Sequence, residues 1–289
     1  MQPDKTCVED SCNATIEKKA FGRQRKIEET FGVYRRLAIA QTTNHEIAQV
    51  CQDGGAATAL LFVAMEKGII DAALITGTHP EKPFYPVLKM ATKPAEILDA
   101  AGSKYTCSQN PITLAAEAKR QGKSKVAFVG MPCQILAFRR LQMVNPPRLD
   151  YVRYSLGLMC SGCFSYELIT EFIQKKVGID LRSIVKINIK QRLLITTNAG
   201  VTPIPLSEIN QYKQKGCLYC RDFSSELADI SVGGMGMDGW SFTVVRSEKG
   251  EELFVNAEKA GFLRTKPVDL NEGTLKLLIR LSQKKSRHE

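Results

Sequence analysis

The chain has 289 residues, a length that suits one large domain or two modest ones. Hydrophobic residues make up 44% and charged residues 24%, which excludes an intrinsically disordered chain, a collagen-like repeat and a disulfide mini-scaffold. Lys and Arg number 40 against 30 Asp and Glu, so the net charge of +10 favours acidic partners: nucleic acid, an anionic membrane or a polyanionic cofactor.

Membrane and secretion signals are not evident. The most apolar stretch, residues 56–75, is interrupted by Glu66, Lys67 and Asp71, so we expect no membrane span. The first twenty residues lack the apolar segment of a signal peptide, so the cytoplasm is the expected location. Because thiols stay reduced there, the nine cysteines indicate metal, cluster or catalytic roles rather than disulfides.

The first half of the chain alternates between helix and strand patterns. Residues 1–30 carry many charges and are interpreted as an extension, a solvated helix or tail. Beyond it, apolar runs and turn residues predict helices over 56–65, 94–101, 112–120 and 135–141, and strands over 69–76, 86–91 and 125–130. Such alternation is typical of a mainly parallel sheet covered by helices.

The second half is more mixed. Strands are predicted over 152–159, 185–189, 193–197, 201–206, 229–233 and 241–246, with helices over 166–177 and 251–260 and a solvated tail over 284–289. The strands between 185 and 206 follow one another with turn residues before the last of them. The predicted fold class is α/β, with a mixed, mainly parallel sheet covered by helices and a more antiparallel C-terminal half.

Five cysteines follow predicted strands or lie in CxxC pairs. Cys133 comes after the strand over 125–130, Cys160 and Cys163 form C-S-G-C after another strand, and Cys217 and Cys220 form C-L-Y-C. Parallel sheets place ligand sites at the carboxyl ends of strands, and a CxxC spacing lets both sulfurs reach one metal centre. A [4Fe–4S] cluster, which needs four thiolates, is favoured over a four-thiolate zinc site and over a thioredoxin-like role.

Two glycine-rich segments are candidate cofactor loops. Gln52, Asp53, Gly54 and Gly55 open a predicted helix, where backbone N–H groups and the helix dipole favour a phosphate; a plain N-cap by Asp53 is the alternative. Residues 234–239 match G-x-G-x-x-G but run into a strand instead of a helix, so a Rossmann site is rejected. The alternative that these residues form a loop that lets a flat cofactor approach the backbone is kept.

The segment 103–108 lies between two predicted helices and holds hydroxyl groups, one cation and one aromatic ring. This set suits either a binding site for a flavin and its phosphates or a surface loop whose polar groups already have hydrogen-bond partners. Cys51 and Cys107 are interpreted as buried small hydrophobes or bystanders near a ligand. His45, His79 and His288 form no evident triad or metal site, so we expect the chemistry to come from cofactors.

Short motifs in a fixed order carry a resemblance to a known family. They are Gln52-Asp-Gly-Gly55, Gly102-Ser-Lys-Tyr105 with Ser108, Pro132-Cys133-Gln134, Gly157-Leu-Met-Cys160 before Ser165-Tyr166, Gly216-Cys217-Leu-Tyr-Cys220-Arg-Asp222 and Asp229-Ile-Ser-Val-Gly-Gly234. On these residues the sequence resembles the coenzyme F420-reducing hydrogenase beta-subunit family. The resemblance implies an iron–sulfur flavoprotein that carries FAD and one [4Fe–4S] cluster and acts on the deazaflavin coenzyme F420 as substrate.

The resemblance also implies which residues form the site. The cluster ligands would be Cys133, Cys160, Cys217 and Cys220, with Cys163, absent from the family pattern, as an alternative to Cys160. The residues lining the flavin would be Gln52, Asp53, Gly54, Gly55, Thr58, Ser103, Lys104, Tyr105, Ser108, Gly233, Gly234 and Gly236. FAD would transfer the hydride, so no catalytic side chain is implied. The expected domains are an extension (1–30), a flavin and F420 domain (31–124) and an iron–sulfur and flavin domain (125–289).

The resemblance implies an electron-transfer subunit that reduces F420 with electrons from hydrogenase large and small subunits. The chain lacks an appended ferredoxin module, which favours the hydrogenase subunit. An F420H2-oxidising subunit of a ferredoxin- or formate-linked reductase is the alternative. A basic, zinc-stapled nucleic-acid-binding protein is a remote alternative, because aromatic residues make up only 7% and no nucleic-acid motif is present.

Overall fold

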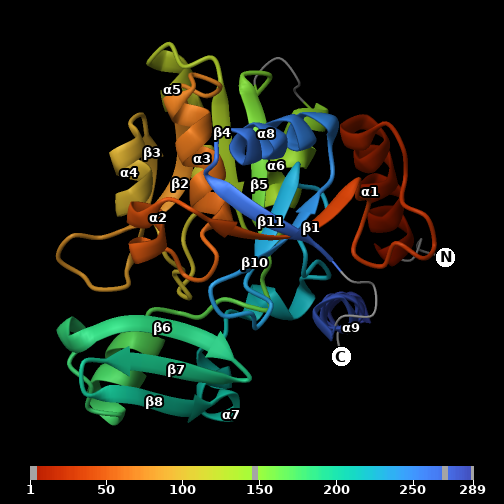
Figure 1. The fold of residues 1–289 in the computed structure, drawn as a ribbon. Coiled ribbons are helices and arrows are strands. Elements are labelled where there is room, and N and C mark those ends of the chain that lie inside the picture. The colour runs from red at the N-terminus through yellow and green to blue at the C-terminus, as the bar shows by residue number, and fades with distance from the viewer. Residues whose placement is uncertain (1–4, 145–148, 269–272, 288–289) are drawn as a thin grey trace.

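A mixed sheet of eight strands forms the centre of the molecule (Figure 1). The structure is a computed structural model that describes residues 5–144, 149–268 and 273–287. The strands of the large sheet are β1 (Arg36–Thr42), β2 (Ala72–Thr78), β3 (Pro86–Ala91), β4 (Val126–Gly130), β5 (Val152–Leu158), β9 (Ile230–Gly233), β10 (Ser241–Val245) and β11 (Leu263–Pro267). Their order across the sheet is β11-β1-β10-β9-β5-β4-β2-β3.

The middle of this sheet is parallel and its two edges are antiparallel. The pairs β2–β4, β4–β5 and β5–β9 run parallel, while β9–β10, β10–β1, β1–β11 and β2–β3 run antiparallel. The parallel strands read as short apolar runs because both of their faces are covered. The predicted fold class, a mixed sheet with a parallel centre, is confirmed.

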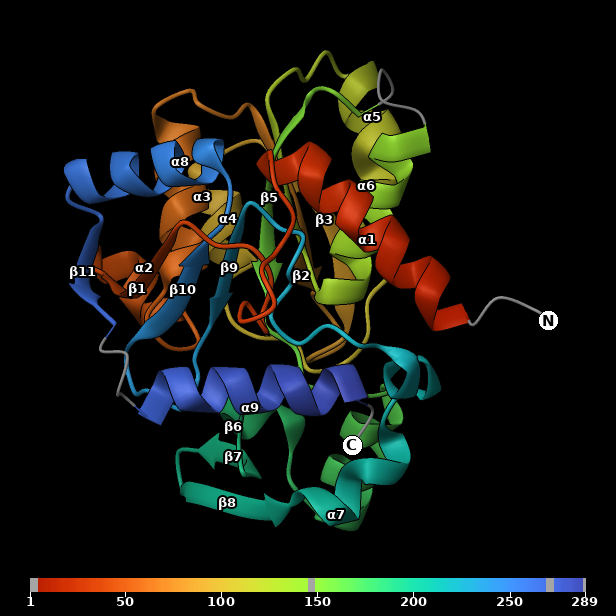
Figure 2. The ribbon, with the colours of Figure 1, turned by 90° about the vertical axis from the view of Figure 1, so that its right-hand side faces the viewer.

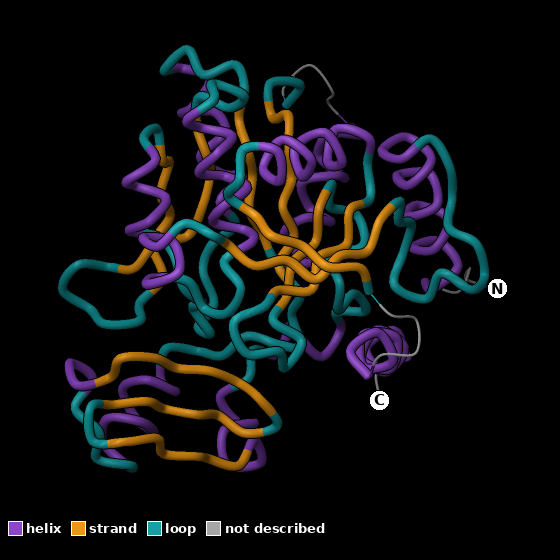
Figure 3. The backbone as a smooth tube through the Cα atoms, viewed as in Figure 1, coloured by secondary structure: helices purple, strands orange, loops and turns teal. Residues whose placement is uncertain are grey.

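Helices cover both faces of the large sheet (Figures 1 and 3). One face packs against α3 (Ala56–Glu66), α8 (Glu248–Lys259) and α4 (Pro94–Asp99), which share one hydrophobic core with the strands. The other face packs against α6 (Pro132–Val144), α5 (Ala115–Arg120) and α1 (Lys5–Phe21) in a second core. Among the described residues, no helix is both long and apolar enough to cross a membrane.

A small antiparallel sheet is inserted between β5 and β9. It consists of β6 (Ile184–Lys190), β7 (Arg192–Thr197) and β8 (Gly200–Pro205), and it packs against a π-helix, Leu168–Lys176. Leu193 and Ile195 alternate toward this helix, which gives the insertion its own core. The antiparallel C-terminal half that the sequence predicts is this small sheet, which lies below the large sheet in Figure 1.

The remaining elements are mostly short, apart from a long helix at the C-terminal end. They are α2 (His45–Val50), α7 (Leu206–Ile209), α9 (Gly273–Arg287) and 3₁₀ turns at Pro111–Leu114, Leu181–Ser183, Asn210–Tyr212 and Lys215–Tyr219. Figure 2 shows α9 crossing between the large sheet and the small sheet. The helix α9 and the strands β1 and β11 were not predicted from the sequence. The edge strand β11 reads L-R-T-K-P and has little strand pattern.

The N-terminal extension is a packed helix rather than a solvated segment. Ile16 is 2% exposed and joins the core formed with α6. Glu17 is 1% exposed and accepts hydrogen bonds from the Arg25 backbone N and Nε at 3.0 and 2.6 Å. Arg25 also pairs with Glu226 at 2.5 Å. The prediction of a solvated extension is wrong here because a buried ion pair, invisible in the charge pattern, holds α1 on the body.

The predicted solvated tail, residues 284–289, falls largely within α9. Lys284 and Arg287 are exposed, Lys285 is half-buried, and residues 288–289 lie outside the described part of the chain. The predicted domain boundary after residue 124 separates β2 from β4, which are neighbours in the large sheet. The division into two domains stays a prediction.

Asp229 anchors the start of β9 as a fully buried carboxylate. Burial alone would raise its pKa, but the charges of Arg139 and Lys249, with hydrogen bonds from Ser155 and Ser247, lower the pKa to about 2. Arg139 Nη2 lies 3.2 Å from the carboxylate, and the Arg139 side chain is itself only 6% exposed. The carboxylate therefore ties β5, α6 and α8 to one point.

We expect Asp229→Asn to destabilise the fold by about 3–5 kcal/mol, because it leaves Arg139 buried without its counter-charge. Urea unfolding measures the loss, and Asp99→Asn, at a carboxylate whose side chain is 71% exposed, serves as the control. Because the folded pKa lies below the ordinary value of 3.8, the stability from Asp229 is lost as pH falls from about 4 through 2. Equal stability of the two variants would contradict this role.

Candidate functional site

The sequence-predicted site residues lie along one edge of the large sheet. β2, β4, β5 and β9 are parallel, so their carboxyl ends share an edge. Cys133 follows β4 in the first turn of α6, Cys160 follows β5, and Gly234 follows β9. The small sheet lies beyond this edge, which makes the site a zone between the two sheets (Figures 1 and 3).

Four of the predicted ligand thiols lie near one another at this edge. Burial raises the pKa of Cys133, and the neighbouring charges of Cys220 and Cys217 raise it further. Burial likewise raises the pKa of Cys160 to about 12, with Cys217 and Cys133 among its neighbours and Lys285 acting in the opposite direction. These mutual influences place Cys133, Cys160, Cys217 and Cys220 in one group, although the chain brings them from three separate segments.

Backbone hydrogen bonds join the loops that carry these thiols. The Cys160 N–H donates to the Phe223 carbonyl at 2.9 Å. The Gln214 N–H donates to the Cys163 carbonyl at 2.9 Å, and the Cys217 N–H donates to the Gln214 carbonyl at 2.9 Å. The C-S-G-C and C-L-Y-C segments are therefore held against each other by backbone hydrogen bonds.

Cys163 does not join this group. It forms a disulfide with Cys107, and the two Cα atoms lie 5.5 Å apart. Thr106 and Phe164, from segments far apart in the sequence, form a parallel β-bridge that brings the neighbouring cysteines within disulfide reach. The expectation that the cysteines form no disulfide is wrong for this pair, and so is the interpretation of Cys107 as a lone small hydrophobe.

The group of four thiols differs from a site for a single metal ion. No three His, Cys, Asp or Glu side chains of the described residues are grouped closely enough to hold one ion. In a [4Fe–4S] cluster each thiolate binds a different iron, so the four sulfurs need not converge on one point.

The loop Gln52–Gly55 forms the N-terminus of α3. The N-cap is Gly55, with a positive φ of 72°, and no side chain caps the helix, so the alternative of an N-cap by Asp53 is wrong. Gly54 has a different role, since a Cβ there would lie 2.4 Å from the Ser241 backbone N. Thr58 is half-buried in the first turn of α3. The helix α3 therefore begins with backbone N–H groups that no side chain caps, and this is the arrangement that binds phosphates.

The glycines at the end of β9 and just after it bring a second loop against this one. A Cβ on Gly234 would lie 2.1 Å from Asp53 Oδ2, and one on Gly233 would lie 2.6 Å from Met159 Sδ. Gly236 has a positive φ of 78° with open space around it. Gly233 and Gly234 thus permit close packing between protein segments, while Gly236 leaves backbone accessible.

The segment 103–108 contacts several parts of the site. The Ser103 N–H lies 3.4 Å from Gln52 Oε1, and Tyr105 Oη donates to Asn188 Oδ1 at 3.2 Å. Ser108 Oγ lies 3.3 Å from Thr76 Oγ1 and 3.5 Å from Gln134 Nε2. Gln134 follows Cys133 directly, so this segment links the glycine loop to the thiol group.

Lys104 does not extend a free cation into the site. Its ammonium donates to the carbonyls of Ala100, Ala101 and Gly102, where α4 ends. These are carbonyls that lack helical partners, so Lys104 caps the helix and supports the segment 103–108 from behind. Burial, and secondarily the charge of Lys89, lowers the pKa of Lys104 to about 8.

We expect this buried amine to give a pH-dependent contribution to stability. Between pH 8 and 10.5 the unfolded chain holds the Lys104 proton while the folded chain releases it, so the fold gains stability as pH rises. The unfolding free energy of the native chain relative to Lys104→Met should therefore increase by about 1–3 kcal/mol across that window. Chemical denaturation at several pH values measures this difference, and a constant difference would contradict the assignment.

Three polar residues of β6 form a part of the site that the sequence analysis missed. Lys186 Nζ donates to the Gln52 carbonyl, and Lys190 pairs with Asp238. Burial raises the pKa of Asp53, whereas the charges of Lys186 and Lys190 oppose this rise. The available signal was the alternation K-I-N-I-K over 186–190, which puts Lys186, Asn188 and Lys190 on one face of the strand.

Two family sequence models match most of this chain. Residues 37–115 match the N-terminal part, and residues 123–271 match the C-terminal part, of "Coenzyme F420 hydrogenase/dehydrogenase, beta subunit". The coenzyme F420 hydrogenase subunit beta of Methanothermobacter thermautotrophicus is 35% identical over 266 residues, which is 89% of this chain and 94% of that protein. The corresponding subunit of Methanosarcina barkeri is 34% identical, covering 88% and 89%.

A solved structure and a more distant relative extend this comparison. A chain of the F420-reducing [NiFe] hydrogenase complex from Methanosarcina barkeri superposes with a TM-score of 0.85 at 33% identity, covering 91% of this chain and 92% of that one. The coenzyme F420-dependent sulfite reductase of Methanocaldococcus jannaschii is 37% identical over 218 residues, but these make up only 34% of that enzyme. The resemblance is confirmed: the chain belongs to the coenzyme F420 hydrogenase/dehydrogenase beta subunit family.

Proposed function

We propose that this chain is an electron-transfer subunit that reduces coenzyme F420, with a [4Fe–4S] cluster held by Cys133, Cys160, Cys217 and Cys220 and with FAD bound beside it. The observation that carries this proposal is the grouping of four thiols from three segments next to the glycine loops of the same sheet edge. Family membership supplies the substrate class, since two relatives that are covered to 94% and 89% of their own length are named as coenzyme F420 hydrogenase subunits.

The donor set fits the proposed cluster. Cysteine thiolates are the usual ligands of [4Fe–4S] clusters, and four are present. Cys160, Cys217 and Cys220 are partly buried, whereas Cys133 is exposed. Bound iron would replace the thiol protons, so the cost of burying thiolate charge would be offset on cluster binding.

The zone between the two sheets fits a flavin dinucleotide. The uncapped N-terminus of α3 and the ammonium groups of Lys186 and Lys190 suit its phosphates. Gly236 leaves backbone open to a flat ring, and Gln52 and Tyr105 place polar groups along the same zone. Lys104 would support this wall from behind rather than touch the flavin.

The two groups would supply complementary electron chemistry when bound: the cluster handles single electrons, and FAD exchanges electron pairs as hydride with the deazaflavin. The chain contributes position and electrostatics. Its cysteines fix the cluster at the sheet edge, while its basic zone attracts the anionic coenzyme. The segment 103–108 joins the two sites through Ser108 and Gln134, which keeps them adjacent.

Hydrogenase subunits are the proposed electron donors. The match covers 94% of one hydrogenase beta subunit but only 34% of the sulfite reductase, so the hydrogenase subunit is the relative whose whole length is better represented in this chain. Oxidation of reduced F420 for another reductase uses the same residues and stays the alternative direction.

Anaerobic purification followed by an F420 assay tests the proposal. We expect about four irons and one FAD per chain, and we expect dithionite-reduced methyl viologen to drive bleaching of F420 absorbance. A protein that carries both groups but leaves F420 unchanged would overturn the proposed substrate. A protein that contained zinc in place of iron would contradict the proposed [4Fe–4S] cluster.

A further inference from the structure

The outer face of α9 carries an unbroken set of cations. Lys276, Arg280, Lys284 and Arg287 are all exposed, and their spacing of three or four residues puts them on one side of the helix. The opposite side is anchored by Leu275 and Leu278, which are 6% and 0% exposed. The helix sequence over 273–287 contains no acidic residue.

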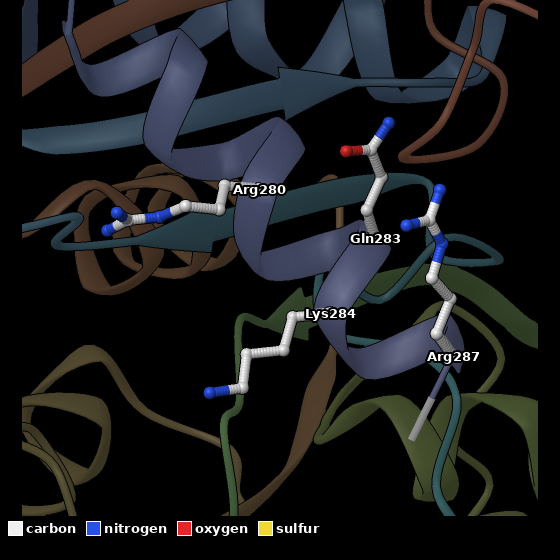
Figure 4. Close-up of a pocket in the computed structure, with 4 residues that line it drawn as sticks. All are labelled: Arg280, Gln283, Lys284 and Arg287. Carbon is white, nitrogen blue, oxygen red and sulfur yellow. The ribbon is translucent and has the colours of Figure 1, made fainter. Parts of the chain in front are cut away.

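Three of these cations, Arg280, Lys284 and Arg287, line a hollow on the surface. Arg280, Gln283, Lys284 and Arg287 line a surface pocket of about 340 Å³, and Figure 4 shows their side chains projecting from successive turns of α9. None of the four cations named above forms an ion pair with another described residue. Exposed cations without counter-charges attract an acidic surface over a distance of about one Debye length.

The C-terminal end of α9 reaches the thiol group. Lys285 Nζ donates to the carbonyls of Ser161 at 3.0 Å and Cys160 at 3.4 Å. The C-S-G-C segment that Lys285 contacts is itself joined to the C-L-Y-C segment through the backbone of Gln214. Figure 2 shows this end of α9 next to that segment.

The C-L-Y-C segment exposes two large side chains between its cysteines. Leu218 is 61% exposed and Tyr219 is 81% exposed. Apolar and aromatic side chains in such positions are typical of the centre of a protein interface, and cations around them are typical of its rim. The α9 face, defined here as Leu218, Tyr219, Lys276, Arg280, Lys284 and Arg287, therefore combines an exposed apolar pair, which lies between two proposed cluster ligands, with the exposed cations of the neighbouring helix.

We propose that the α9 face docks the acidic surface of an electron-carrying iron–sulfur protein, which exchanges single electrons with the cluster site through Leu218 and Tyr219. The inference rests on the proposed function, because a partner docked here can exchange electrons only if Cys217 and Cys220 hold a cluster. Charge complementarity selects an acidic partner, and the exposed apolar pair selects a protein rather than a small anion. One electron passes from the partner to the chain in each encounter, so no bond is made or broken.

The test measures electron transfer to the complete cofactor-loaded chain from a purified acidic two-cluster ferredoxin reduced with dithionite. We expect the second-order rate constant to fall at least about 10-fold as salt rises from about 0.02 to 0.5 M. Reversing the four cations, K276E with R280E, K284E and R287E, should lower the low-salt rate by a similar factor and remove the salt dependence. Leu218→Ser with Tyr219→Ser should slow transfer at every salt concentration.

A matched control reverses four cations at the opposite, amino edge of the parallel strands: Lys67, Lys119, Lys123 and Lys125, each to Glu. This change has the same effect on net charge, so an equal loss of rate would overturn a specific α9 face. An unchanged rate in the α9 variant would also overturn it. Binding of the chain to phosphatidylglycerol vesicles through these cations, with carrier rates unaffected, would replace the protein partner by a membrane and overturn the proposal.

Viologen-driven F420 reduction tests the proposed function separately from the docking face. The α9 cation variant and the Lys67, Lys119, Lys123 and Lys125 variant should keep it, because methyl viologen is a small cation that needs no docking face. Loss of this activity in the unmodified chain would contradict the proposed function itself. Its retention, with no effect of the α9 substitutions on the ferredoxin rate, would contradict only the docking face.

Discussion

Replacing Cys217 by Ser is expected to remove most of the iron from the protein. A serine hydroxyl is a far weaker ligand for iron than a thiolate, and the three remaining thiols leave one iron without a protein ligand. Iron analysis and the visible absorbance of anaerobically purified protein measure the loss. We expect less than about half of the iron to remain, with loss of viologen-driven F420 reduction.

Two further cysteines make this experiment selective. Cys51 donates its thiol to the Asp53 carbonyl at 3.0 Å beside the glycine loop, so Cys51→Ser changes a half-buried thiol outside the group and should keep the iron. Cys163 pairs with Cys107, so Cys163→Ser should also keep the iron, whereas Cys160→Ser should lose it. If Cys160→Ser kept its iron and Cys163→Ser lost it, Cys163 would be the ligand instead of Cys160.

The location of the thiol group was predictable from local sequence, and its neighbours were not. Cys133 and Cys160 directly follow apolar runs that form parallel strands, and carboxyl ends of parallel strands meet at one edge. Cys217 and Cys220 come from a 3₁₀ turn after the small sheet, so only the order of motifs linked them to the others. The pairing of Cys163 with Cys107 depends on a bridge between distant segments, which no local pattern encodes.

The basic side of the flavin zone shows a different limit of sequence reasoning. Lys104 lies within the recognised motif Gly102-Ser-Lys-Tyr105, yet its ammonium caps α4. Lys186 and Lys190 lie in a strand whose alternation is plain, but only the tertiary fold brings that strand over Gln52. The charge on a segment is thus readable from sequence, while the surface it faces is set by packing between the two sheets.

Lys186 is therefore the residue for which we expect the largest effect on flavin binding. Its ammonium donates to the Gln52 carbonyl beside the uncapped N-terminus of α3, a position that suits a phosphate oxygen. A hydrogen bond between charged groups is worth about 1.5–3 kcal/mol, so Lys186→Met should weaken FAD binding about 10- to 100-fold. Lys186→Arg keeps the charge and should recover part of this loss.

Flavin titration of the chain stripped of its FAD measures these affinities. Lys175 lies on the π-helix of the same insertion and pairs with Glu171 at 2.9 Å in solvent, so Lys175→Met is the matched control and should bind FAD normally. Equal weakening in both variants would indicate damage to the insertion rather than a lost phosphate contact. Normal FAD affinity in Lys186→Met, with a raised KM for F420, would instead assign this ammonium to the anionic groups of the substrate, because the same positive charge at the zone between the sheets serves either ligand.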